Sequence, residues 1–128
     1  MNVTIYPGTC RGEVIIPPSK SLSHRAIICA ALANGTSKIE NIHYSQDILA
    51  TISALGKLGA EIQCEEDSLL IHGGIKLEAD SAQLVHCKES GSTLRFMIPL
   101  FALRETQTIF TGEGRLLQRP QTVYQDIF

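Results

Sequence analysis

The sequence has 128 residues, of which 44% are hydrophobic and 19% are charged. These values fit one globular domain or part of a larger one, and they exclude disordered and collagen-like chains. Eleven Lys and Arg residues against thirteen Asp and Glu residues give a net charge of −2, so we expect no general binding to nucleic acid or to an anionic membrane. Uncharged runs are too short for a membrane span, which needs about 20 apolar residues. Any affinity for anions must therefore come from a few basic residues placed together.

The cysteines and the N-terminus indicate a reduced, cytoplasmic protein. The spacing of Cys10, Cys29, Cys64 and Cys87 matches no paired metal-ligand pattern, so we expect mostly packed thiols without disulfides or zinc. Residues 1–5 lack the basic-then-apolar pattern of a secretory signal.

The first half of the chain predicts alternating strands and helices. In order, these are a strand at residues 13–16, a helix at 22–33, a strand at 36–42, a helix between 45 and 59, and a β-hairpin of residues 60–64 and 68–72. Ser19 or Ser21 can cap the first helix, and Ser45 caps the second. The first helix is apolar on nearly every face, which predicts burial almost all round, whereas the second is amphipathic.

The second half repeats this order of elements. A strand at residues 84–87, a helix at about 93–103, a strand at 106–111 and a helix from about Pro120 are expected. Ser21-x-x-x-Arg25 and Gly91-x-x-x-Arg95 occupy equivalent places, which sets a period of 70 residues from Arg25 to Arg95. The second copy should then extend to about residue 143. The chain ends before that, at Phe128, so we expect it to be part of a longer protein.

Basic residues at helix starts are the candidates for chemistry. Lys20, Ser21 and Arg25 surround the start of the first helix, where free backbone amides and the positive end of the helix dipole favour an anion. They predict a phosphate or carboxylate site. The alternative is that Arg25 pairs with an internal carboxylate and that Lys20 is solvated.

The start of the helix at 93–103 repeats the arrangement. Gly91 permits close backbone approach, and Ser92 offers a hydroxyl. Arg95 is expected to support loops from inside rather than to touch a ligand. Glu89 is unfavourable beside an anion unless it points away or is neutralised.

The third candidate is Arg119. Pro120 suits the first helical position, which places Arg119 at a helix N-terminus, while Arg115 is expected to be a surface charge. Three such helix starts imply a ligand with more than one anionic group. Asp47 is expected first as a helix-cap charge and second as a substrate contact, and His24 as a packed, hydrogen-bonded ring.

Three motifs occur in the order and separation typical of one enzyme family: Pro18-Ser19-Lys20-Ser21-x-x-x-Arg25, Ser90-Gly91-Ser92-Thr93-Leu94-Arg95, and Gly112-Glu113-x-Arg115-x-x-x-Arg119-Pro120. Together they resemble the 5-enolpyruvylshikimate-3-phosphate synthases over essentially the whole chain. The family commonly has Asn where Glu89 stands and Thr where Ser92 stands.

The resemblance implies an α/β (α+β) fold of repeated βαβαββ units, arranged in two domains of three repeats. Residues 1–18 would form a strand segment and crossover belonging to the second domain. Residues 19–128 would form part of the N-terminal domain, with a first repeat at about 19–74 and a truncated second repeat at about 84–128.

The implied reaction transfers the enolpyruvyl group of phosphoenolpyruvate to the 5-hydroxyl of shikimate 3-phosphate and releases phosphate, in aromatic amino-acid and chorismate biosynthesis. No metal or organic cofactor is implied, and the full-length enzyme is expected to be a monomer. Because Gly91 matches the glycine of glyphosate-sensitive members, inhibition by glyphosate is expected.

The resemblance also assigns roles by position. Lys20, Ser21 and Arg25 would bind shikimate 3-phosphate, and Lys20, Gly91 and Arg119 would bind phosphoenolpyruvate. Lys20 would share in acid–base catalysis, and the surrounding residues would be Asp47, Glu89, Ser92 and Arg95. The main catalytic carboxylates of the family belong to the second domain, so this chain alone is expected to be inactive.

Two alternatives stay open at this point. The related transferases acting on UDP-N-acetylglucosamine have Asn after the motif lysine, where this sequence has Ser21. A non-catalytic, anion-binding α/β module is the second alternative.

Overall fold

The computed structural model describes residues 2–76, 78 and 81–128, and its mixture of helices and strands confirms the predicted α/β class. The first unit contains α1 (Lys20–Leu32), β1 (Thr36–Ile39), α2 (Gln46–Lys57), β2 (Glu61–Cys64) and β3 (Leu69–His72). The second unit contains β4 (Gln83–His86), α3 (Gly91–Ala102), β5 (Thr108–Thr111), the short 3-10 helix η1 (Leu116–Gln118) and α4 (Thr122–Ile127).

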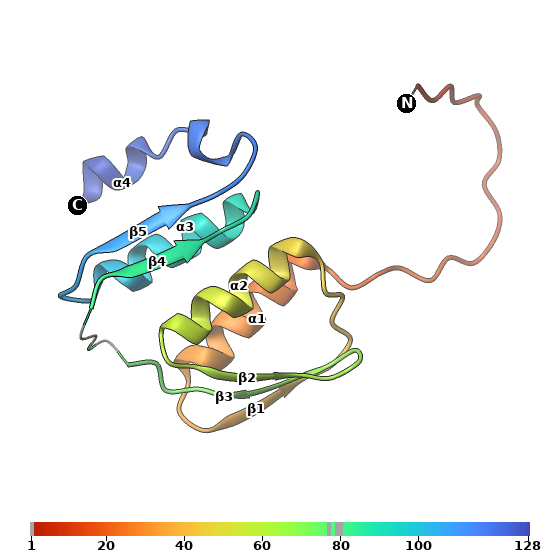
Figure 1. Ribbon diagram of the computed structural model, residues 1–128. Coiled ribbons are helices and arrows are strands. Elements are labelled where there is room, and N and C mark those ends of the chain that lie inside the picture. The colour runs from red at the N-terminus through yellow and green to blue at the C-terminus, as the bar shows by residue number, and fades with distance from the viewer. Residues whose placement is uncertain (1, 77, 79–80) are drawn as a thin grey trace.

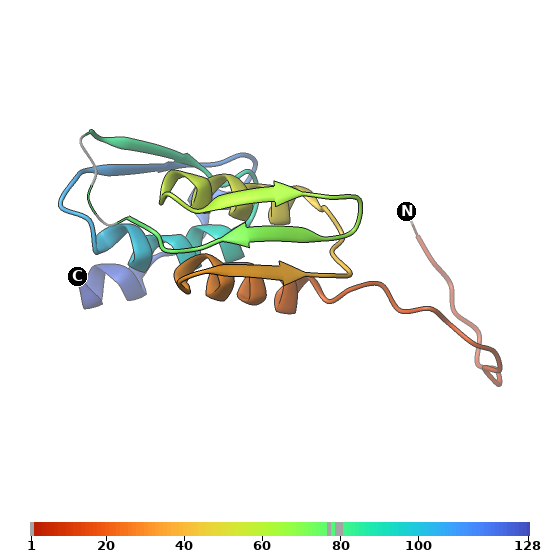
Figure 2. The same ribbon diagram turned by 90° about the horizontal axis from the view of Figure 1, so that it is seen from below.

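In the first unit, α1 and α2 cover one face of a three-stranded antiparallel sheet of order β1-β3-β2 (Figures 1 and 2). The acidic turn between β2 and β3 closes the hairpin that the sequence predicts. Leu69 and Ile71 of β3 are buried, because alternate side chains of a strand point to the same face of the sheet.

In the second unit, β4 and β5 pair in parallel, and α3 connects them (Figure 1). Parallel neighbours need such a crossover because the chain must return to the same end of the sheet. Helix α3 packs against α2, so buried side chains from both units form one core. Met97 and Phe101 of α3 belong to this core together with Leu55 of α2.

The helices α1, α2 and α3 all begin at the same end of the molecule (Figures 1 and 2). Each has a serine N-cap, which is Ser19, Ser45 or Ser90. Each hydroxyl accepts a hydrogen bond from the backbone N–H three residues later, at N···O distances of 3.4, 3.3 and 3.1 Å respectively. The positive ends of three helix dipoles are thereby gathered at one end.

The strand expected at residues 13–16 is not formed. Residues 2–17 are extended and lead away from the rest of the chain (Figure 1), and Ile15 is 95% exposed. A strand needs a neighbour to satisfy its backbone groups, and none of the described strands pairs with this segment.

The expectation that the first helix is buried on nearly every face is wrong for this structure. Only one face of α1 is buried, which includes His24 and Ile27, whereas Leu22 is 68% exposed. The helix is apolar in composition, but one sheet and one neighbouring helix can cover only one side of α1.

Two other predicted boundaries differ for local reasons. The first strand ends at Ile39 rather than residue 42, because Asn41 adopts a positive φ of 59° that breaks the extended conformation. The last helix starts at Thr122, so Pro120 precedes it rather than occupying its first position. The expectation that Arg119 lies at a helix N-terminus is therefore wrong, because Arg119 follows the last residue of η1.

The cysteines are free thiols, and three of the four are exposed rather than packed. Only Cys87 is buried, and burial raises the pKa of its thiol to about 11. None of the helices in the described part of the chain has the length and apolarity to cross a bilayer.

Candidate anion-binding site

Lys20 and Asp47 form an ion pair where α1 and α2 begin. The Lys20 Nζ atom lies 2.6 Å from Oδ2 of Asp47. Asp47 occupies the first turn of α2, where the helix dipole favours a carboxylate. The Lys20 side chain is 56% exposed, so it is solvated as well as paired, and Asp47 both complements its helix and orients the lysine.

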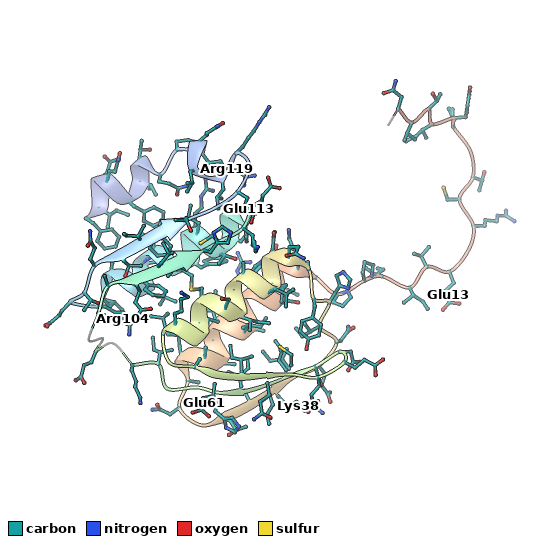
Figure 3. The ribbon with its side chains drawn as sticks, viewed as in Figure 1. Glu13, Lys38, Glu61, Arg104, Glu113 and Arg119 are labelled. Atoms are coloured by element: carbon teal, nitrogen blue, oxygen red, sulfur yellow. The ribbon has the colours of Figure 1, made fainter. Side chains whose placement is uncertain are left out.

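Gly91 and Arg119 are in close contact at the start of α3. A Cβ atom at Gly91 would lie only 2.7 Å from Nη1 of Arg119, so the guanidinium occupies space that a side chain would fill. Arg119 follows η1, whose buried Leu116 fixes this loop in the core. Figure 3 shows Arg119 together with Glu113 at the end of the molecule where the three helices begin.

Glu113 holds the loop that leads to Arg119. Its Oε1 lies 3.0 Å from Nε2 of His86 and 3.3 Å from Nζ of Lys88. The hydrogen bonds from His86 and Lys88 lower the pKa of the Glu113 carboxyl. The contacts tie this loop to the end of β4.

Glu89 packs over the same loop. A Cβ atom at Gly114, where φ is 55°, would lie 1.7 Å from Oε1 of Glu89. A side chain at this position would strain the backbone and would displace the Glu89 carboxylate. The Glu89 carboxylate therefore contacts Gly114, and Glu89 also lines the cavity described below.

A cavity of about 450 Å³, open to solvent, lies between the starts of the helices and this loop. It is lined by Lys20, Asp47, Glu89, Gly91, Ser92, Arg95, Phe96 and Arg119. Three cationic side chains face two carboxylates, and the starts of α1, α2 and α3 each contribute a lining residue. The cations outnumber the carboxylates by one, and together with the helix starts they favour a small anion.

Arg95 is exposed and lines this cavity. The expectation that it supports loops from inside is wrong, because its position in α3 turns away from the core side marked by Leu94 and Met97. Arg95 instead adds a cation to the cavity wall.

Ser21 and Arg25 lie outside the lining, next to it. The Arg25 guanidinium stacks on the ring of Phe96, 5.3 Å from its centroid, and Nη1 of Arg25 donates to the Ser21 carbonyl oxygen at 2.9 Å. Among the described residues Arg25 makes no ion pair with a carboxylate, so the alternative of an internal partner is wrong. Phe96 lies between the cavity, which it lines, and a second basic area, where Arg25 supplies the positive charge beside Ser21.

His24 is a packed, hydrogen-bonded ring, as predicted. It is 1% exposed, and its Nδ1 lies 2.8 Å from Oγ1 of Thr51. Burial lowers the pKa of His24 below its ordinary value of 6.5, Lys20 and Arg25 act in the same direction, and Asp47 opposes them. The ring is therefore neutral at pH 7.

Sequence reasoning missed Phe96 and the buried Thr51, and it did not foresee that the Thr93 hydroxyl is buried between helices. Both threonines are fully buried in otherwise apolar helix faces. A hydroxyl in such a face is the signal that points to a buried polar contact. In the part of the chain that the structure describes, no group of three His, Cys, Asp or Glu side chains is arranged to hold a metal ion.

The fold and the cavity define an α/β protein with a cavity lined by three cationic side chains at the starts of three helices. The sequence profile of the family described as EPSP synthase (3-phosphoshikimate 1-carboxyvinyltransferase) matches residues 6–127. The chain belongs to this family.

Individual relatives agree with this assignment. The chain is 50% identical to the 3-phosphoshikimate 1-carboxyvinyltransferase of Clostridium beijerinckii over 99% of its own length and 31% of the relative's. It is 51% identical to that of Clostridium kluyveri over 98% of its own length and 29% of the relative's. The chain therefore spans about three tenths of the length of these relatives.

The fold is similar to a solved structure of EPSP synthase from Acinetobacter baumannii. The TM-score is 0.71 at 29% sequence identity, and the similarity covers 90% of this chain and 27% of that one. The family resemblance stated from the three motifs is confirmed.

Proposed function

We propose that this chain supplies the first part of the active site of an enzyme that transfers the enolpyruvyl group of phosphoenolpyruvate to the 5-hydroxyl of shikimate 3-phosphate. The observation that carries the proposal is the convergence of Lys20, Arg95 and Arg119 on one cavity at the starts of three helices. Membership of the family supports the same reaction, and favours shikimate 3-phosphate over a UDP-sugar as the acceptor.

The two basic areas suit the two substrates. Phosphoenolpyruvate, with its phosphate and carboxylate, fits the cavity beside Lys20, Gly91 and Arg119. Shikimate 3-phosphate fits the neighbouring patch of Ser21 and Arg25, with Lys20 between the two.

The chemistry is an addition followed by an elimination. The 5-hydroxyl oxygen bonds to C2 of phosphoenolpyruvate, the hydroxyl proton leaves to a base, and C3 gains a proton. The resulting tetrahedral intermediate then loses phosphate from C2 and a proton from C3, which restores the double bond. Fixed cations stabilise the negative charge that gathers along this path.

Lys20 is positioned to share in the proton transfers. Its ion pair with Asp47 keeps the ammonium at the border between the two areas. Asp47, Glu89, Ser92 and Arg95 shape the surroundings, and the main catalytic carboxylates lie outside residues 1–128.

Several expectations from the sequence stay proposals. Residues 1–18 belong to a second domain, and residues 19–128 form part of the first. The enzyme acts as a cytoplasmic monomer without a metal or organic cofactor. Glyphosate competes for the space beside Gly91. The 128-residue chain alone has no catalytic activity.

The test compares two arginines in the full-length enzyme. Arg119 lines the cavity, whereas Arg115 is exposed and outside the lining. Arg119→Ala should lower kcat/KM for phosphoenolpyruvate about 100-fold, because a charge-assisted contact to the anion is lost. Arg115→Ala, the matched control, should stay within about twofold. Equal kinetics for both variants would contradict the proposed site.

A second measurement concerns the acceptor patch. Calorimetric titration of the 128-residue chain with shikimate 3-phosphate should give weak binding that Arg25→Ala abolishes. Heat protection of the full-length enzyme by UDP-N-acetylglucosamine, but not by shikimate 3-phosphate, would favour the other acceptor. Full activity at saturating glyphosate would contradict the expected inhibition.

A further inference from the structure

A chain of buried polar side chains crosses the three helices beneath the cavity. Nδ1 of His24 in α1 lies 2.8 Å from Oγ1 of Thr51 in α2, which lies 2.7 Å from Oγ1 of Thr93 in α3. The Thr93 hydroxyl in turn lies 2.7 Å from Oγ of Ser90, the N-cap of α3. All four residues are buried, with at most 1% of each exposed.

Such a chain is not needed to fill the space between the helices. Valine has nearly the shape of threonine, and it would pack there without the cost of desolvating a hydroxyl. Hydrogen bonds add direction, because their energy falls steeply when the donor or acceptor moves off line. The hydroxyls of Thr51 and Thr93 therefore resist sliding and rotation of α2 against α3, which apolar contacts tolerate.

The chain of hydrogen bonds reaches both walls of the cavity. Besides Ser90, the Thr93 hydroxyl lies 3.2 Å from the backbone carbonyl oxygen of Asp47. Asp47 holds Lys20 on one wall. Ser90 lies between Glu89 and Gly91 on the other wall, and Gly91 supports Arg119.

His24, at the other end of this chain of hydrogen bonds, sets the direction in which the hydroxyls donate. Within the described residues, Nε2 of His24 has no hydrogen-bond partner. A buried acceptor without a partner is tolerated more often than a buried N–H without one, so the proton of the neutral ring is assigned to Nδ1. His24 then donates to Thr51, Thr51 donates to Thr93, and the single Thr93 proton is shared between Oγ of Ser90 and the carbonyl oxygen of Asp47.

We propose that the chain of His24, Thr51, Thr93 and Ser90 is a positioning device for the anion cavity, with Thr93 as the positioning residue that fixes the Gly91 wall against the Asp47 wall. The inference rests on the proposed function, because it assigns to these buried groups the alignment of the phosphoenolpyruvate contacts. None of the four side chains lines the cavity, so they act through Asp47 and Gly91.

The test uses isosteric variants of the full-length enzyme. Thr93→Val should raise KM for phosphoenolpyruvate about tenfold, as expected for loss of a buried hydrogen-bonding group, and should leave KM for shikimate 3-phosphate within about twofold. Thr93→Ser keeps the hydroxyl and should restore the wild-type KM. Thr51→Val, which touches neither wall, should shift KM in the same direction by a smaller factor.

Thr108→Val is the matched control. Thr108 is half-buried in β5, and its Oγ1 has no hydrogen-bond partner among the described residues. The same change of atoms there should alter neither KM.

A second readout needs no turnover. The backbone amides of residues 90–93 should exchange hydrogen about tenfold faster in Thr93→Val than in the wild type, while those in the middle of α1 stay unchanged. If the wild-type enzyme showed no turnover, the proposed function would be contradicted. The hydrogen-exchange comparison would still test the positioning role of Thr93, because it does not depend on turnover. Unchanged exchange at residues 90–93, or equal rises in KM for both substrates, would show that Thr93 only packs the core.

Discussion

Gly91 and Gly114 leave room for charged side chains at and beside the cavity. Arg119 occupies the space above Gly91, and Glu89 occupies the space above Gly114. The positions of the Arg119 and Glu89 side chains therefore depend on glycine, which has no side chain, at residues 91 and 114. A composition count or a list of basic residues does not reveal this.

Gly91→Ala should displace Arg119 without unfolding the protein. The added methyl group would meet Nη1 of Arg119 at 2.7 Å, and the end of a flexible side chain can move away. We expect KM for phosphoenolpyruvate in the full-length enzyme to rise about tenfold with little change in melting temperature.

Gly56→Ala serves as the control for this change. Gly56 is also helical, and a Cβ atom there meets nothing within 4 Å. Its substitution should leave KM unchanged and raise stability by up to about 1 kcal/mol. Wild-type KM in Gly91→Ala would show that Arg119 does not need its present position.

His24 should make stability depend on pH. Its pKa in the folded protein is lower than the ordinary 6.5 expected after unfolding, so the unfolded state binds more protons as pH falls below that value. The contribution is complete above about pH 6.5 and is lost as pH falls toward the lower, folded pKa. Urea unfolding at pH 7.5 and 5.0 should show a loss of stability at pH 5.0.

His24→Asn tests the assignment, because the amide keeps a polar atom near the place of Nδ1 but does not titrate. The loss between pH 7.5 and 5.0 should be smaller in this variant than in the wild type. An identical loss in both proteins would assign the pH dependence to other groups.

At the scale of elements, β3 returns to the end of α1 through a close backbone contact. A Cβ atom at Gly73 would lie 2.1 Å from the carbonyl oxygen of Ala33 and 2.3 Å from that of Ala30. The Gly73 N–H donates to the Gly35 carbonyl at 2.9 Å. This contact fixes how α1 lies across the sheet, and so where Lys20 is presented.

Gly73→Ala should destabilise the protein by about 3 kcal/mol, because the methyl group meets backbone atoms that cannot turn aside. Denaturant unfolding of the 128-residue chain measures this. Gly8→Ala is the control, since a Cβ atom there has open space, and it should be neutral. A loss below about 0.5 kcal/mol in Gly73→Ala would mean that α1 shifts easily on the sheet.

At the scale of the whole molecule, residues 2–17 stand apart from the packed body (Figure 1). Val14, Ile15 and Ile16 are each more than 80% exposed, and three exposed apolar residues in a row suit a partner surface. This agrees with the proposal that the segment belongs to a second domain.

Deletion of residues 2–16 should leave the melting temperature of the 128-residue chain within about 2 °C, because these residues bury almost no surface against the body. Thermal unfolding followed by circular dichroism checks this. A fall of more than about 5 °C would show that the segment packs on the body in solution.

Much of the fold was predictable because local signals coincide with tertiary contacts. Ser19, Ser45 and the stripe of α2 predicted helices at the right places, since capping and periodicity act within a few residues. The strand predicted at residues 13–16 does not form, because a strand needs a neighbouring strand to satisfy its backbone groups. The burial of α1 also depended on how many neighbours it has.

By itself, the sequence determined where α1, α2 and α3 lie, the serine caps of α1 and α2, and the position of Lys20 at the start of α1. Only the tertiary structure decided that Arg95 joins Lys20 and Arg119 in one cavity, that Arg25 lies beyond Phe96, and that buried threonines link the helices beneath. The reason is range: capping and periodicity act between neighbours along the chain, whereas a binding site is assembled from side chains far apart in sequence, whose distances are set by packing.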